Sequence, residues 1–217
     1  MKLIRPSAVF EAEKDPRASE FYSKLVTYYL LFSTFVASLI IGLSGDVLSL
    51  IANESYLGAL KVIPFTCIAV LLLGLQGYMS IGLMLKRKTG WFPLCTGLGL
   101  GLTLALEVLL TPAMGASGAA ISLAAGYGLS SFLRFRISRD VHPIYFEPRL
   151  FKIFVSSVAV LGLALIVPGS PSVFTLAARL LIIVIGMPAT LFIMKFFEDI
   201  EIKQTRELVA SRLRKRI

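Results

Sequence analysis

The stretch FTCIAVLLLGL, at residues 65–75, lies inside a run from Val62 to Leu85 that contains no charged residue. Apolar and polar residues do not alternate along this run, so it predicts a helix and not a strand of a membrane barrel. It is longer than the roughly 20 apolar residues that a helix needs to cross the hydrocarbon core of a bilayer. The block LLIIVIG at 180–186 has the same character. The sequence therefore predicts membrane-spanning helices.

Further uncharged runs extend this prediction to six spans. Of the 217 residues, 56% are hydrophobic and 16% are charged, which a water-soluble domain with a polar surface could hardly carry. With their ends trimmed, the runs predict helices over 25–43, 62–85, 91–110, 115–133, 151–167 and 174–197. We expect an all-α fold: a polytopic membrane protein with six transmembrane helices in one bundle.

Lysine and arginine are segregated along the chain. Of the 22 Lys and Arg residues, 20 lie in the head, in the connections after the second and fourth predicted spans, and in the tail; the exceptions are Lys61 and Arg179. Because successive spans cross the membrane in opposite directions, these four segments lie on the same side. The positive-inside rule places this side, and with it both termini, in the cytoplasm. Anionic lipid at that surface accounts for the net charge of +9, so no nucleic-acid partner is expected.

The same pattern divides the chain into three parts. Residues 1–24 are expected to form a cytoplasmic head or linker, 25–197 the transmembrane lobe, and 198–217 a basic cytoplasmic tail. Apolar residues at a helical spacing among the basic residues of the tail favour a short interfacial helix, and a solvated disordered tail is the alternative.

The residues that enzymes and metal centres need are scarce. His142 is the only histidine, so one chain cannot assemble a multi-histidine metal or catalytic cluster. Cys67 and Cys95 fall near opposite faces of the membrane, too far apart for a disulfide. We expect no enzymatic activity, no metal and no cofactor.

Small residues spaced by four predict close packing between helices. This pattern comprises Gly118, Ser122, Gly126 and Ser130 on the fourth predicted span, and Gly97 and Gly101 on the third.

Glu107 and Arg179 are charged residues that fall within predicted spans, both in the outer third of the membrane. A charge in hydrocarbon usually faces a partner or water. We expect the two side chains to pair or to line an outward-facing vestibule together. The alternative is that each extends separately to the outer interface.

Hydroxyl groups form two further stripes. Thr96 and Thr103 share a helical face with Glu107, and on the first span Thr34 and Ser38 continue a stripe from Thr27. Two such faces indicate a hydrated cavity. Equally compatible with the pattern is that each hydroxyl bonds the carbonyl oxygen one helical turn earlier. Gln76 and Tyr78, near the middle of the second span, could face the same cavity or lie between packed helices.

The chain resembles the C-terminal half of the polysaccharide flippases, of the O-antigen and teichoic-acid type, in the multidrug/oligosaccharidyl-lipid/polysaccharide exporter superfamily. The resemblance rests on short motifs before the second span, in the cytoplasmic turn and at the start of the fourth span: Tyr56, Gly58 and Ala59; Lys88 and Thr89; and Pro112, Gly115, Gly118, Ala119 and Ala120.

The resemblance implies an exporter of two six-helix lobes around a central cavity, which moves lipid-linked oligosaccharide across the cell membrane by alternating access. This chain matches the second lobe, so its implied partners are membrane lipid, the lipid-linked substrate, and a missing N-terminal lobe or a second copy. Open alternatives are an exporter of peptidoglycan precursors or drugs from the same superfamily, a non-transporting membrane scaffold, and an inactive fragment.

Flipping requires a polar groove for the headgroup, with a cation for the pyrophosphate and hydroxyls for the sugars. The residues expected to bind the substrate are Arg179, Glu107, Thr103, Gln76, Thr34 and Ser38.

Overall fold

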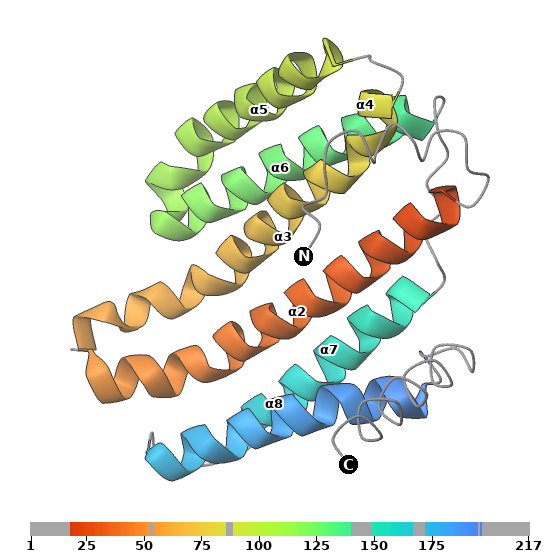
Figure 1. Cartoon of the computed structure of the whole chain (residues 1–217). Coiled ribbons are helices and arrows are strands. Elements are labelled where there is room, and N and C mark those ends of the chain that lie inside the picture. Colours follow the sequence, from red (N-terminus) through yellow and green to blue (C-terminus); the bar gives the residue numbers. More distant parts are fainter. Residues whose placement is uncertain are drawn as a thin grey trace, which may run out of the picture.

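The computed structural model describes residues 18–52, 54–85, 89–139, 149–166, 172–194 and 196, which are built from helices without any strand (Figure 1). In chain order the elements are α2 (Ala18–Ile51), the 3-10 helix η2 (Glu54–Lys61), α3 (Ile63–Met79), α4 (Ile81–Leu85), α5 (Trp91–Met114), α6 (Ala116–Arg139), α7 (Arg149–Ile166) and α8 (Val173–Ile193). Helix α2 begins inside the predicted head. Residues 1–17, His142 and the predicted tail 198–217 lie outside the described residues.

Five of the described helices are long and apolar enough to cross a membrane: Tyr22–Ile51 within α2, Trp91–Met114, Ala116–Ser138, Arg149–Ile166 and Val173–Ile193. This confirms the predicted all-helical class and the predicted set of several membrane-length helices for this part of the chain. Within the second predicted span lies α3, a shorter apolar helix, and the other five predicted spans each fall on one of the five membrane-length helices.

The second predicted span is divided. Helix α3 has 17 residues, about 26 Å at 1.5 Å per residue, against a hydrocarbon core of about 30 Å. It ends at Ser80, whose backbone N–H donates to the carbonyl oxygens of Gln76 at 3.0 Å and Gly77 at 3.2 Å. The short helix α4 follows at once. The uncharged run 62–85 thus predicted the apolar segment correctly and its continuity as one helix wrongly.

Two helices extend well past their predicted ends. Helix α2 has 34 residues where the apolar run predicted 25–43. Helix α6 continues to Arg139 where the run predicted an end at residue 133, so Arg134 and Arg136 belong to a helix and not to a connection. A charge-free run measures the part of a helix suited to hydrocarbon, whereas the backbone hydrogen bonds of a helix continue through polar residues.

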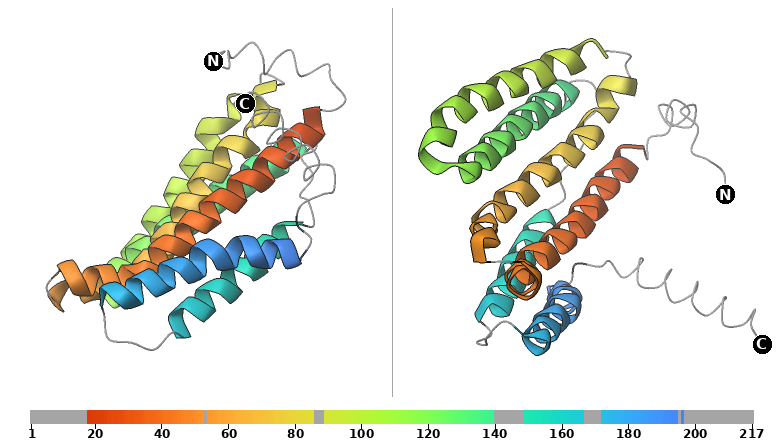
Figure 2. Two further views of the ribbon diagram at one scale, coloured as in Figure 1. Left: turned by 60° about the horizontal axis from the view of Figure 1, so that its bottom comes forward. Right: turned by 90° about the vertical axis from the view of Figure 1, so that its left-hand side faces the viewer.

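The helices lie in an extended layer (Figures 1 and 2). Helix α6 packs between α5 and α3, α3 packs against α2, and α2 packs against both α7 and α8. The long helices α2, α3, α5, α6, α7 and α8 run in alternating directions across the layer, as Figure 1 shows. Helix α2 therefore joins the α3, α5 and α6 part of the layer to the α7 and α8 part.

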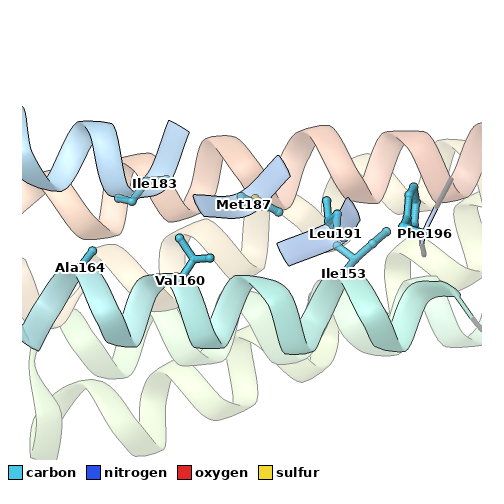
Figure 3. Packing of buried hydrophobic residues seen from close by; sticks show 7 residues of the cluster. All are labelled: Ile153, Val160, Ala164, Ile183, Met187, Leu191 and Phe196. Atoms are coloured by element: carbon cyan, nitrogen blue, oxygen red, sulfur yellow. The ribbon is translucent and has the colours of Figure 1, made fainter. Parts of the chain in front are cut away.

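Apolar side chains hold α7 and α8 together (Figure 3). Helix α8 contributes one residue per turn to this core, because its buried residues are spaced by four. Large side chains of α2, including Leu31, Phe35 and Leu39, cover the core from one side. The buried members are Ile153, Val160 and Ala164 of α7, Ile183, Met187 and Leu191 of α8, and Phe196.

Helices α5 and α6 form a hairpin joined by a single residue, Gly115. Its φ of 60° lies in the left-handed region that favours glycine. Its N–H donates to the carbonyl oxygen of Thr111 at 2.8 Å, which ends α5. The turn places the last residues of α5 beside the first residues of α6.

The predicted small-residue stripe of α6 lies at this contact: Gly118, Ser122, Gly126 and Ser130 are all buried. A Cβ atom at Gly126 would lie 2.6 Å from the carbonyl oxygen of Gly99 on α5. The α5 side differs from the prediction. Gly97 and Gly101 are exposed with open space around them, because Gly99 lies between them on the opposite face and makes the close approach.

Candidate functional site

A groove of about 470 Å³ lies between α2 and α3. Its lining is largely apolar, with hydroxyl groups from Tyr29, Ser33 and Thr66. The hydroxyl of Tyr29 donates to the carbonyl oxygen of Leu71 at 3.1 Å, and its ring lies 4.8 Å from that of Tyr78. These contacts fix α2 against α3 along the groove. The lining residues are Tyr29, Phe32, Ser33, Val36, Ala37 and Ile40 of α2, Ala59 of η2, Val62, and Ile63, Thr66, Cys67, Val70 and Leu71 of α3.

An ion pair joins α2 to α8. Nη1 of Arg179 lies 2.9 Å from each carboxylate oxygen of Asp46. The Arg179 side chain is 14% exposed and that of Asp46 is 3% exposed. Asp46 lies six residues beyond Ile40, the last groove residue of α2, so it is about 9 Å further along the helix and on another face. The pair lies near the groove but does not line it.

The predicted pairing of Arg179 with Glu107 is wrong. Arg179 pairs with Asp46, and Glu107 is exposed on α5. Helices α5 and α8 lie at opposite edges of the layer, as both figures show. The two charges have similar expected depths, but depth does not determine which helices are neighbours.

The predicted hydroxyl stripes bond mostly to their own helices. Thr34 Oγ1 donates to Leu30 O at 2.5 Å and Ser38 Oγ to Thr34 O at 2.9 Å. Thr103 Oγ1 donates to Gly99 O at 3.1 Å and is buried where α5 meets α6. Each bond spans one helical turn, as the alternative interpretation of the stripes expects.

Gln76 lies between packed helices. Its side chain is buried, and Nε2 lies 3.4 Å from the carbonyl oxygen of Tyr127 on α6.

None of the six residues predicted to bind substrate lines the groove, and the structure does not bring all six together. They are spread over α2, α3, α5 and α8. The hydroxyls bond within their own helices, Gln76 bonds to α6, Arg179 pairs with Asp46, and Glu107 is exposed.

Sequence reasoning missed two residues with notable surroundings. Asp46 follows the first apolar run directly, and the length of α2 brings it into the helix beside Arg179. Arg134 was assigned to a connection, but it lies within α6 and donates to Ser80 Oγ at 2.8 Å and Thr96 Oγ1 at 2.7 Å. The sequence could have indicated both residues, because each directly follows a charge-free run and the helix predicted from that run could continue through it.

The helices and the groove define a coarse class, a helical protein with the features of a multi-pass membrane protein. Comparison with family models, curated proteins and solved structures gives no significant match. The resemblance to flippases therefore stays a prediction from the sequence.

Proposed function

We propose that this chain is one half, the C-terminal lobe, of a flippase that moves lipid-linked oligosaccharide across the cell membrane during polysaccharide biosynthesis. In this proposal both termini face the cytoplasm, and the other wall of the transport path comes from an N-terminal lobe or a second copy. The chain itself carries out no chemical step.

The groove between α2 and α3 is the observation that carries the proposal. Its apolar lining suits the lipid tail of a substrate, which must remain in an apolar environment while the headgroup crosses. Ser33 and Thr66 add hydrogen-bonding groups to a surface that is otherwise apolar.

The ion pair sets a condition on the proposal. In this structure Arg179 is held by Asp46, so its charge is already neutralised. For Arg179 to contact a pyrophosphate, the substrate anion has to compete with the Asp46 carboxylate. The arrangement therefore corresponds to a state without substrate, and substrate binding is expected to open the pair.

The two cysteines offer a direct test of the groove. Cys67 lines it, whereas Cys95 is buried in α5, and both thiols are free. The purified chain is reconstituted in phosphatidylcholine nanodiscs and treated with a membrane-permeant maleimide, and alkylation of each cysteine is followed by peptide mass spectrometry. We expect lipid-linked oligosaccharide to slow alkylation of Cys67 and to leave Cys95 unchanged.

Phospholipid with tails of matched length and no oligosaccharide is the control ligand. Equal protection of Cys67 by this lipid and by the substrate would contradict the proposal, because the groove would then take any acyl chain. Unchanged Cys67 alkylation with the substrate, in a sample whose Cys95 stays unreactive, would contradict it as well.

A further inference from the structure

Arg134 is a partly buried cation held between three segments of the chain. From α6 its guanidinium donates to Ser80 Oγ, between α3 and α4, at 2.8 Å, and to Thr96 Oγ1 of α5 at 2.7 Å. Its Cζ lies 5.5 Å from the centre of the Phe92 ring. The guanidinium is therefore fixed in place by two hydroxyls and an aromatic face.

Neutral groups alone contact this cation within the described residues. Arg179, at the other end of the layer, has the Asp46 carboxylate 2.9 Å away, whereas Arg134 has hydroxyl oxygens and a ring. Hydroxyls satisfy N–H groups but do not cancel a charge. A guanidinium carries five N–H donors, and two are used in these bonds, while Nε is buried without a described acceptor. Among the residues that the structure describes, the site thus holds a positive charge without a carboxylate beside it.

The side of the cluster at Thr96 is open. Thr96 is exposed, and among the described residues its hydroxyl accepts from Arg134 without donating to an acceptor. The first turn of α5 lies nearby, and its N-cap, Gly90, provides no side-chain hydrogen bond. The positive end of a helix dipole therefore adds to the charge of Arg134.

We propose that Arg134, Ser80 and Thr96 form a binding site for a phosphate group. The guanidinium supplies the charge and further N–H donors, and the free hydroxyl hydrogen of Thr96 supplies another donor to a phosphate oxygen. Such a group can come from the headgroup of an anionic membrane lipid or from a soluble phosphate compound. The site lies on α5, α6 and Ser80, the residue between α3 and α4. It is away from the groove and does not depend on the proposed function.

The only tryptophan of the chain, Trp91, gives a local readout. It is 43% exposed and adjoins Phe92, which contacts Arg134. The full chain is placed in nanodiscs of phosphatidylcholine and phosphatidylglycerol at equal amounts, with bromine on the chains of one lipid or the other. Stronger quenching of Trp91 fluorescence by brominated phosphatidylglycerol measures the preference for the anionic headgroup.

Arg134→Gln is compared with Arg136→Gln, which removes the same charge from an exposed position on the same helix. We expect Arg134→Gln to lower the preference about fivefold and Arg136→Gln to leave it nearly unchanged. No preference in the unaltered chain, or equal losses in the two variants, would overturn the proposal. If Arg134→Gln loses its helical circular dichroism, Arg134→Lys decides: a single ammonium cannot hold both hydroxyls and a phosphate, so an unchanged preference would overturn it.

Inorganic phosphate separates the two sources. Added at constant ionic strength against chloride, it is expected to leave the quenching preference unchanged if the lipid headgroup is the natural ligand. If added phosphate abolishes the quenching preference in the unaltered chain, and does so equally in Arg136→Gln, the site is assigned to soluble phosphate compounds. Once Arg134→Gln has lowered the preference, the first result assigns the site to the lipid headgroup and the second to soluble phosphate compounds.

Discussion

Removing the Arg179 side chain is expected to destabilise the protein strongly. Arg179→Gln leaves Asp46, which is 3% exposed, without the guanidinium that lies 2.9 Å from both its oxygens. Two unit charges about 4 Å apart attract by about 4 kcal/mol at an effective dielectric constant of about 20. Breaking a buried pair by removing one partner typically costs about 3 to 5 kcal/mol, because an uncompensated charge stays buried.

The free energy of unfolding can be measured by titrating mixed micelles with sodium dodecyl sulfate and following helical circular dichroism. We expect Arg179→Gln to lose about 3 to 5 kcal/mol. The double variant Asp46→Asn with Arg179→Gln should recover most of that loss, because neither charge remains. Glu107→Gln, at an exposed position, is the control and should stay within about 0.5 kcal/mol of the unaltered protein.

A loss of stability in Arg179→Gln no larger than that in Glu107→Gln would contradict this prediction, since the ion pair would then be as well solvated as a surface charge. A loss in the double variant equal to the sum of the losses in Asp46→Asn and Arg179→Gln would contradict it as well. That result would mean that Asp46 and Arg179 act through separate contacts and not through one another.

Three further predictions concern helix packing and helix ends, and each is measured by the same titration. Gly126→Ala should cost about 1 to 3 kcal/mol, because its Cβ would lie 2.6 Å from a backbone oxygen of α5, whereas Gly101→Ala, in open space, should be neutral or stabilising. Gly115→Ala should cost about 1 to 2 kcal/mol, since a left-handed φ is unfavourable for alanine, and no loss would contradict the single-residue turn. Ser172→Ala should cost about 1 kcal/mol, because it removes the capping box that starts α8; a stability equal to that of the unaltered chain would exclude this role.

The sequence alone was sufficient for the helical class and for the approximate position of most helices. The reason is that a bilayer demands about 20 apolar residues per span, and this demand leaves long charge-free runs that are easily recognised. The α6 stripe from Gly118 to Ser130 was also predictable, since small residues every four positions have few other uses in a membrane helix.

Contacts between helices distant in sequence could not be predicted in this way. Arg179 was matched with Glu107 on depth, yet the arrangement of the layer puts Asp46 beside it. Helix ends were missed for a related reason. Asp46 and Arg134 lie beyond the apolar runs but within helices, and the side chains that contact them come from segments distant in sequence, which the local sequence does not reveal.

Asp46 and Arg179 are 133 residues apart in the chain, and this separation matters during biosynthesis. At about 5 to 20 residues per second, a ribosome needs roughly 7 to 27 s to add Arg179 after Asp46. During that interval the nascent chain carries the carboxyl group on a membrane-length helix without its counterion. Because an isolated charge is costly in hydrocarbon, we expect α2 to reach its final position only once α8 has been made. Helix α8, made after every other described helix, thus supplies the counterion of α2, the earliest of them.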